Sequence, residues 1–389
     1  MSHTKPNLKL RIAIATLGRY HVLDLARELA ELGHEVRFYS YVPRARAKSF
    51  GLPAECHVSL LAYLWPLIIL AKIFKGANAR SWIDHLTHLS ANWLVQRRLQ
   101  PCDVFIGMSG IYLEAAITAK QRYGARILLE RASVHIDDQV DILRAVQRVH
   151  KGATVVPAWS VKREHDGYAI ADAIVVPSSH ARQSFLQRSF PSAKLWKIPF
   201  GVDLSMFKPN PDWKREPKML LFVGNWSYQK GADIVTDAIN ALADPQIRLL
   251  HVGSTGDTPF PAESWFTSIG HIDQSALREW YCKASILVLP SRQDGFALVL
   301  LQALACECPI IGSEQTAAPD LKNINGLSDW VDVIQCDNVS ALASAISRRL
   351  DITTPTISKK LSREQLSWKA YGSRYNSALQ NLMVVENCN

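Results

Sequence analysis

The chain has 389 residues, which is too long for one ordinary core. Its content of 48% hydrophobic and 20% charged residues is that of a globular protein. The formal net charge of +9 is unevenly placed, since residues 1–200 carry 27 Lys and Arg against 15 Asp and Glu, and residues 201–389 carry 17 against 20. The basic first half indicates either an anionic partner or an ordinary solvated surface.

The cysteines and the N-terminus indicate the cellular compartment in which the protein is expected. Seven cysteines, odd in number and scattered, argue against a disulfide framework and favour reduced thiols in a cytoplasmic protein. Residues 1–9 are polar and lead into an apolar run, so we expect no secretory signal.

Strand and helix patterns alternate through the first half. A strand at 10–15, an amphipathic helix at 21–32 and a strand at Glu35–Ser40 form a βαβ unit, which predicts a parallel sheet. Further strands are expected at residues 104–107, 127–130 and 173–176.

The most apolar segment, residues 60–74, is shorter than the roughly 20 residues needed to span a bilayer and is interrupted by Pro66 and Lys72. Two interpretations remain open. The segment dips into a membrane interface from the cytoplasmic side, or it forms a buried helix or an interdomain wall.

The second half repeats the alternation. Strands are expected at residues 219–223, 248–252, 285–289 and 310–311, after a proline-rich connector at 198–217. A last helix at 362–382 carries Trp368, Tyr371, Tyr375 and Leu379 on one side. We therefore predict an α/β protein with Rossmann-like domains at 1–200 and 201–365, a returning helix at 366–389, and a ligand cleft between the domains.

Residues 285–305 combine a buried strand, a glycine turn that contains Asp294, and an apolar helix that contains Gln302. A strand that feeds a helix through a tight turn exposes backbone N–H groups, which bind phosphate oxygens. The pattern is typical of a site for a ligand with a diphosphate at one end and hydroxyls at the other, such as a nucleotide-sugar.

Five segments, in order along the chain, resemble motifs of the retaining GT-B glycosyltransferases of family GT4. They are A-D-x-x-x-x-P-S at 171–178, P-F-G-V-D at 199–203, F-V-G-N-W-S-Y-Q-K-G at 222–231, the stretch from Pro290 to Pro309, and L-S-W at 366–368. The resemblance implies two Rossmann-like domains, a last helix that crosses back to the first, and a hexosyltransferase-like reaction. In that reaction a sugar leaves a nucleotide-diphosphate donor with retention of configuration.

The resemblance also implies roles for donor-side residues. Lys230 holds the donor diphosphate, Asn225 stands at the family's Arg position, and either Arg292 or Arg19 supplies the missing cation. Asp294 and Gln302 occupy the family's pair of glutamates, which puts Asp294 near the sugar and the Gln302 carbonyl near the ribose. The phosphate cradle consists of the backbone of Gly295, Phe296, Ala297 and Leu298, together with Gly18 in the first strand–helix loop. Ala297 and Glu307 stand where the family usually has Gly, so we expect no glycine-only backbone angles at Ala297.

On the first domain, His135 follows the strand at 127–130, where many relatives carry a histidine near the sugar. A lone histidine is more often structural, yet its place at a strand end favours a catalytic role beside Lys230 and Asp294. Arg19, His21, Arg131 and Ser133 are expected to bind the acceptor.

The acceptor implied by the basic first domain is a glycan or a polyprenyl-linked glycan used in surface polysaccharide assembly, on the inner face of an anionic membrane. No D-x-D motif occurs, so we expect no metal, no cofactor beyond a UDP- or GDP-linked co-substrate, and no nucleic-acid partner. The departures at Asn225, Gln302 and Glu307 keep open a non-catalytic scaffold that binds a nucleotide-sugar or a glycan. A nicotinamide dehydrogenase is disfavoured because no G-x-G-x-x-G follows a strand.

Overall fold

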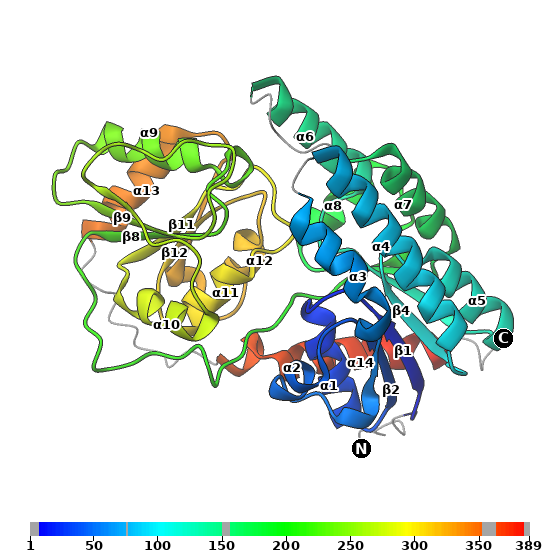
Figure 1. Ribbon diagram of the computed structural model, residues 1–389. Helices are drawn as coiled ribbons and strands as arrows, with labels where there is room; N and C mark the ends of the chain where they lie inside the picture. The colour runs from blue at the N-terminus through cyan, green and yellow to red at the C-terminus, as the bar shows by residue number, and fades with distance from the viewer. Residues whose placement is uncertain (1–7, 75–76, 150–155, 352–362, 385–389) are drawn as a thin grey trace, which may run out of the picture.

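The computed structural model describes residues 8–74, 77–149, 156–351 and 363–384, and they form two lobes, each built around a parallel sheet (Figure 1). The start of the predicted last helix, residue 362, lies outside the described residues. The predicted GT-B arrangement is confirmed.

The first sheet has the strand order β3-β2-β1-β4-β5-β6-β7. Its strands in chain order are β1 Arg11–Ala15, β2 Glu35–Ser40, β3 His57–Ser59, β4 Val104–Met108, β5 Arg126–Glu130, β6 Ala173–Val176 and β7 Leu195–Lys197. The helices of this lobe are α1 His21–Glu31, α2 Arg44–Ser49, α3 Leu61–Ile73, α4 Ala77–Arg98, α5 Leu113–Tyr123, α6 Ile136–Val149, α7 Ala158–Ile170 and α8 Ser179–Gln187.

The second sheet has the order β10-β9-β8-β11-β12-β13. Its strands are β8 Met219–Val223, β9 Arg248–Val252, β10 Phe266–Ser268, β11 Ile286–Leu289, β12 Ile310–Ser313 and β13 Val331–Ile334. The helices of this lobe are α9 Ala232–Leu242, α10 Gln274–Lys283, α11 Leu298–Ala305, α12 Ala318–Lys322 and α13 Val339–Asp351.

The strands β4, β8 and β11, in the middle of the two sheets, are apolar along their whole length, as is typical where helices cover both faces of a parallel sheet. All five residues of β8 and all four of β11 are buried. The two strands pair in parallel, with Ile286 opposite Leu220 and Leu287 opposite Leu221. Ligands of such parallel sheets bind at the carboxyl ends of the strands, so we expect a site among the loops that follow them.

Two passes of the chain connect the lobes. The connector after β7 meets the start of the last helix, α14 Trp368–Val384, where the Val202 N–H donates to the Leu366 carbonyl at 2.7 Å. Gly201 is required there, since a Cβ would lie 2.5 Å from the Trp368 nitrogen. Helix α14 then crosses back onto α1, with Gly372 against Glu28 (Figure 1).

Helix α3 lies on the outside of the first lobe beside α4, so the segment at 60–74 is not a buried helix. Within α3 only Leu64 is buried. Large apolar side chains remain exposed along both helices, and we call the following set the α3–α4 surface: Tyr63, Trp65, Ile69, Leu70, Ile73, Phe74, Trp82, Leu86, Leu89 and Trp93. None of the described helices is both long and apolar enough to cross a membrane.

Candidate functional site between the two lobes

A cavity of about 460 Å³ opens between the lobes. The second lobe contributes Asp294, Phe296, Ala297, Leu298 and Gln302 to its wall, all from the turn after β11 and the start of α11. The first lobe contributes Arg19 and His21 from the loop after β1 and the start of α1. Seven of the predicted site residues therefore face one cavity.

The turn before α11 is organised by Asp294. Its Oδ1 accepts hydrogen bonds from the backbone N–H groups of Phe296 at 3.2 Å and Ala297 at 2.8 Å. Its Oδ2 forms an ion pair with the Lys230 ammonium. The carboxylate thus both closes the turn and holds the lysine at the N-terminal end of α11.

The backbone at Ala297 differs from the expectation. Ala297 has φ 56° and ψ 78°, so a residue with a Cβ adopts the left-handed region that the family's glycine would occupy without strain. Glu307, just after α11, does the same with φ 59°. The backbone at both ends of α11 is therefore left-handed although neither residue is a glycine, at a cost of about 1–2 kcal/mol per residue.

Gln302 lies in the wall of the cavity and is buried. Its Oε1 accepts a hydrogen bond from the Tyr281 hydroxyl at 2.9 Å. One lone pair of the carbonyl that was expected to bind a ribose is therefore engaged, and the second lone pair and the amide NH₂ remain for a ligand.

The two candidates for the missing cation differ in position. Arg292 forms ion pairs with Asp233 and Asp337 and stacks on the Tyr228 ring, with its guanidinium 3.5 Å from the ring centroid. Arg19 instead lines the cavity, over the Phe50 ring at 3.6 Å. Of these two arginines, Arg19 is the one placed to meet an anionic ligand.

Asn225 and Gly18 lie outside the cavity wall. Asn225 is exposed in the loop after β8, and its Oδ1 accepts from the Ser254 hydroxyl at 3.0 Å. Gly18 is half-buried in the loop after β1, next to the Tyr41 ring. Their donor-binding roles stay predictions.

His21 is fixed by a buried network that the sequence did not indicate. Its Nε2 lies 2.8 Å from Glu130 Oε2, and Glu130 Oε1 accepts from the Tyr375 hydroxyl of α14 at 2.6 Å. The imidazole stacks on Phe200 of the connector with ring centroids 4.1 Å apart. One side chain of the cavity is thereby tied to β5, to the connector and to the last helix.

The loop after β5 reaches the donor turn. Ser133 Oγ accepts a hydrogen bond from Gln293 Nε2 at 2.8 Å, and the backbone of Ala132 lies against Gly295. Ser133 therefore contacts the second lobe, while its predicted role with the acceptor stays a prediction.

Arg131 and His135 are not brought to the cavity. Arg131 is buried and donates to Glu164 at 2.7 Å and to Gln139 at 2.6 Å, so its guanidinium holds helices of the first lobe together. His135 is 5% exposed and packs against Tyr168 and Phe185. Burial lowers the pKa of His135 to about 4, which keeps the ring neutral near pH 7.

Several residues of the cavity wall were missed by the sequence reasoning. Phe200 lies in the connector motif and Trp368 starts the last helix, so their motifs carried a signal, whereas no pattern indicated Asp24, Arg27 or Gln274. Gln274 accepts from Arg19 across the cleft at 3.1 Å. Such pairs join residues far apart in the chain.

Known proteins resemble the chain in both lobes. Residues 18–206 match the model described as Glycosyltransferase Family 4, and residues 217–351 match the model described as Glycosyl transferases group 1. D-inositol 3-phosphate glycosyltransferase of Thermobispora bispora is 24% identical over 332 residues, 76% of this chain and 74% of that protein.

Solved structures share the fold. Sucrose-phosphate synthase from Thermosynechococcus elongatus superposes with a TM-score of 0.65 at 19% identity, covering 96% of this chain and 99% of that one. HepE of Anabaena, solved with UDP-glucose, gives a TM-score of 0.66 at 12% identity and covers 96% and 100%. With both of its lobes matched by models of this group, the chain belongs to glycosyltransferase family 4 and is a glycosyltransferase.

Proposed function

We propose that the protein is a retaining glycosyltransferase that takes its sugar from a UDP- or GDP-linked donor bound in the cavity between the lobes. One observation carries the proposal: the Asp294 carboxylate lines that cavity at the N-terminal end of α11 and holds the ammonium of Lys230, which is not itself part of the cavity wall. A helix N-terminus and a lysine together favour a diphosphate.

Donor binding exchanges one partner of Lys230 for another. In the structure the ammonium pairs with Asp294 Oδ2. A diphosphate at the start of α11 competes for the ammonium and leaves Oδ2 free to accept a hydrogen bond from a sugar hydroxyl. Asp294 Oδ1 stays with the turn, so the carboxylate anchors the sugar without moving.

The chemistry follows from where charge develops. As the glycosidic bond breaks, negative charge grows on the leaving diphosphate, and Lys230 and the N-terminus of α11 stabilise it. The acceptor hydroxyl attacks from the same face of the sugar, and the leaving phosphate takes its proton. No side chain has to form a covalent intermediate, and the configuration is retained.

The donor class is supported by two further observations. The cavity of about 460 Å³ is within the range of small-molecule sites, roughly 300–1,000 Å³. HepE, which shares the fold, was solved with UDP and with UDP-glucose. UDP-linked sugars are therefore the first donors to test.

A donor screen tests this proposal. The melting temperature is measured with UDP-, GDP-, ADP- and TDP-linked sugars, and nucleotide release is then followed for any donor that raises it. We expect one donor class to raise the melting temperature, because only the folded protein binds it. A protein that binds a donor but releases no nucleotide in the presence of glycan acceptors would be the non-catalytic scaffold instead.

The acceptor we propose is a glycan carried on a polyprenyl lipid at the inner face of a membrane, as in surface polysaccharide assembly. The α3–α4 surface supports this, since it exposes ten large apolar side chains on adjoining helices of the basic lobe. Arg98 stacks on Tyr63 at 4.3 Å and Arg97 lies 5.3 Å from the Trp93 ring. Aromatic rings beside cations are typical of surfaces that rest on anionic lipid.

A further inference from the structure

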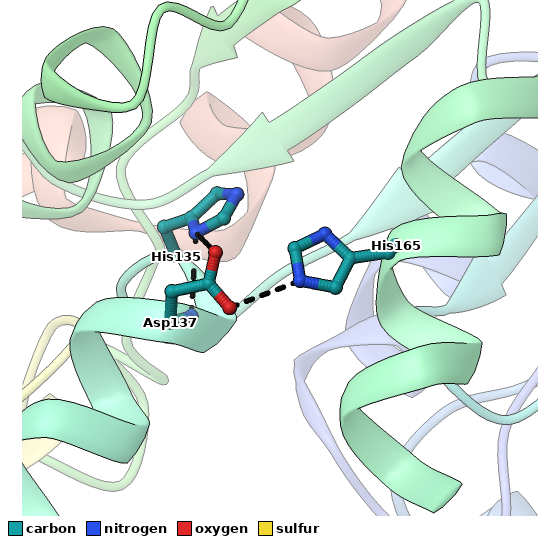
Figure 2. Close-up of side chains that lie close together, drawn as sticks. All are labelled: His135, Asp137 and His165. Carbon is teal, nitrogen blue, oxygen red and sulfur yellow. Dashed lines mark hydrogen bonds and ion pairs between the residues drawn. The ribbon is translucent and has the colours of Figure 1, made fainter. Parts of the chain in front are cut away.

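Two imidazoles and one carboxylate converge on the first lobe, outside the cavity between the lobes (Figure 2). His135 precedes α6, Asp137 lies in the first turn of α6, and His165 extends from α7 toward both. Their ligand atoms lie within 4.8 Å of one another, and no other group of three such residues is found in the described parts of the chain. We call them the His135–Asp137–His165 cluster.

The cluster has the spacing of a metal site. Asp137 Oδ2 lies 3.6 Å from His135 Nδ1, and Asp137 Oδ1 lies 2.9 Å from His165 Nε2. Two ligands bound at about 2.1 Å to a common tetrahedral ion are about 3.4 Å apart. His165 is exposed and Asp137 half-buried, so these are the two side chains that we expect to rotate toward a common ion.

The nitrogen of His135 that faces the cluster is Nδ1. It accepts the Asp137 backbone N–H at 3.3 Å, so Nδ1 carries the lone pair in this tautomer, and an ion would take that lone pair in place of this long hydrogen bond. Aromatic contacts with Tyr168 and Phe185 fix the ring. The geometry points to a site for one first-row transition-metal dication, best matched to Zn²⁺, held by His135, Asp137 and His165 with its fourth position open to water.

The charges around the cluster permit a cation. The positive side chains near the cluster already have carboxylate partners. Arg188 pairs with Asp138 and Asp141, Lys162 pairs with Asp166, and the buried Arg131 pairs with Glu164. Arg144, at the rim of the same groove, lies 4.0 Å from Asp141. Asp137 is thus the carboxylate that neutralises an incoming ion, and the groove that it lines with His165, Asp141 and Lys162 is the expected route of water to the fourth position.

Such an ion would join α6 to α7 directly behind the loop that meets the donor turn. His135 is two residues from Ser133, which accepts from Gln293 of the second lobe. The proposed ion therefore stabilises the shape of the loop across which the lobes touch, and it takes no part in the sugar transfer. This inference does not depend on the proposed donor or acceptor.

Cobalt substitution tests the site in the full, untagged chain after treatment with a chelator. Co²⁺ bound by two imidazoles and a carboxylate in four-coordinate geometry gives visible absorption, which Zn²⁺ then abolishes by displacement. We expect one ion per chain and a higher melting temperature with Zn²⁺. His165→Ala and Asp137→Asn should each weaken the affinity for Co²⁺ at least about tenfold and remove the stabilisation.

His271→Ala is the matched control, because His271 is also an exposed histidine but lies in the second lobe. It should bind Co²⁺ as the parent protein does. The proposal is overturned if the parent gives no cobalt absorption at millimolar ion, or if His165→Ala binds the ion as tightly as the parent.

Discussion

Gly295 of the donor turn lies against the carbonyl oxygen of Ala132 in the opposite lobe. A Cβ on Gly295 would lie 1.8 Å from that oxygen, a distance that no pair of unbonded atoms adopts. The φ of Gly295 is not among the positive values of the chain, so the glycine is needed for the close approach and not for its backbone angles.

Gly295→Ala should therefore force the lobes apart at the donor turn. We expect kcat/KM for transfer to fall at least about tenfold, because small displacements of a positioned site are costly. Small-angle scattering should report a larger radius of gyration than that of the parent. Gly33→Ala, where a Cβ meets nothing within 4 Å, should lose stability and keep the parent's kcat/KM and radius.

Lys230→Ala should lower kcat for transfer by about 10²–10³, because one positioned charge opposite the leaving diphosphate is removed. Lys218→Ala is the matched control, since Lys218 forms an ion pair with Asp244 outside the cavity. Steady-state rates and circular dichroism distinguish the two variants. Equal rates in Lys230→Ala and the parent would remove Lys230 from the mechanism.

Gln302→Glu should tighten binding of the donor. One carboxylate oxygen would keep the hydrogen bond from Tyr281, and the other would accept a charge-assisted hydrogen bond from a ribose hydroxyl, in place of the weaker one that the neutral amide of Gln302 offers. A charge-assisted hydrogen bond is worth about 1.5–3 kcal/mol before the repulsion from the diphosphate is subtracted. We therefore expect the Kd for the donor to fall several-fold. Titration calorimetry measures it, and unchanged or weaker binding would place the ribose elsewhere.

Replacing apolar residues of the α3–α4 surface by glutamate should abolish membrane binding while leaving the fold intact. Ile73 and Trp82 are 64% and 69% exposed, so Ile73→Glu with Trp82→Glu removes no core contact. We expect the parent to float with vesicles that contain anionic lipid and the double variant to remain below. Leu32→Glu, at an exposed position outside this surface, is the control and should float. A parent that binds neither anionic nor neutral vesicles contradicts the proposed acceptor surface.

Acid should destabilise the first lobe through His88. Burial beside Trp159 and the nearby charge of Arg163 outweigh Asp84, so the pKa of His88 is lowered to about 4 in the folded protein. Below about pH 6.5 the imidazole of His88 is protonated in the unfolded chain but stays neutral in the folded chain until the pH approaches 4. The free energy of unfolding therefore falls as the pH drops from about 6.5 to about 4.

His88→Leu removes this titration. Between pH 7 and pH 4.5 the variant should lose about 1–3 kcal/mol less stability than the parent, as measured by urea unfolding at both pH values. Other buried histidines titrate in the same window, so the difference between the two proteins is the informative quantity. Identical losses would show that His88 is already protonated, or exposed, in the folded state.

Sequence patterns predicted correctly those features that depend on residues close together in the chain. The strand–turn–helix at 285–305 places Asp294 and Gln302 as expected because a few neighbouring residues fix that shape. Arg131 also follows a strand, yet its long side chain turns inward to Glu164, 33 residues further along the chain. Pairs such as Ser133 with Gln293 or His21 with Tyr371 form only when the lobes and α14 assemble, so no sequence spacing encodes them.

Two segments of the chain, lying side by side, join the lobes. Val202 and Ser367 form a parallel bridge where the outgoing and returning passes of the chain cross between the lobes. A single strand would let one lobe swivel freely, whereas two strands bonded side by side resist torsion and leave bending as the easy motion. We therefore expect any opening of the cleft to bend the molecule at this bridge, and the turn that carries Asp294 and Gly295 to keep its register against Ala132.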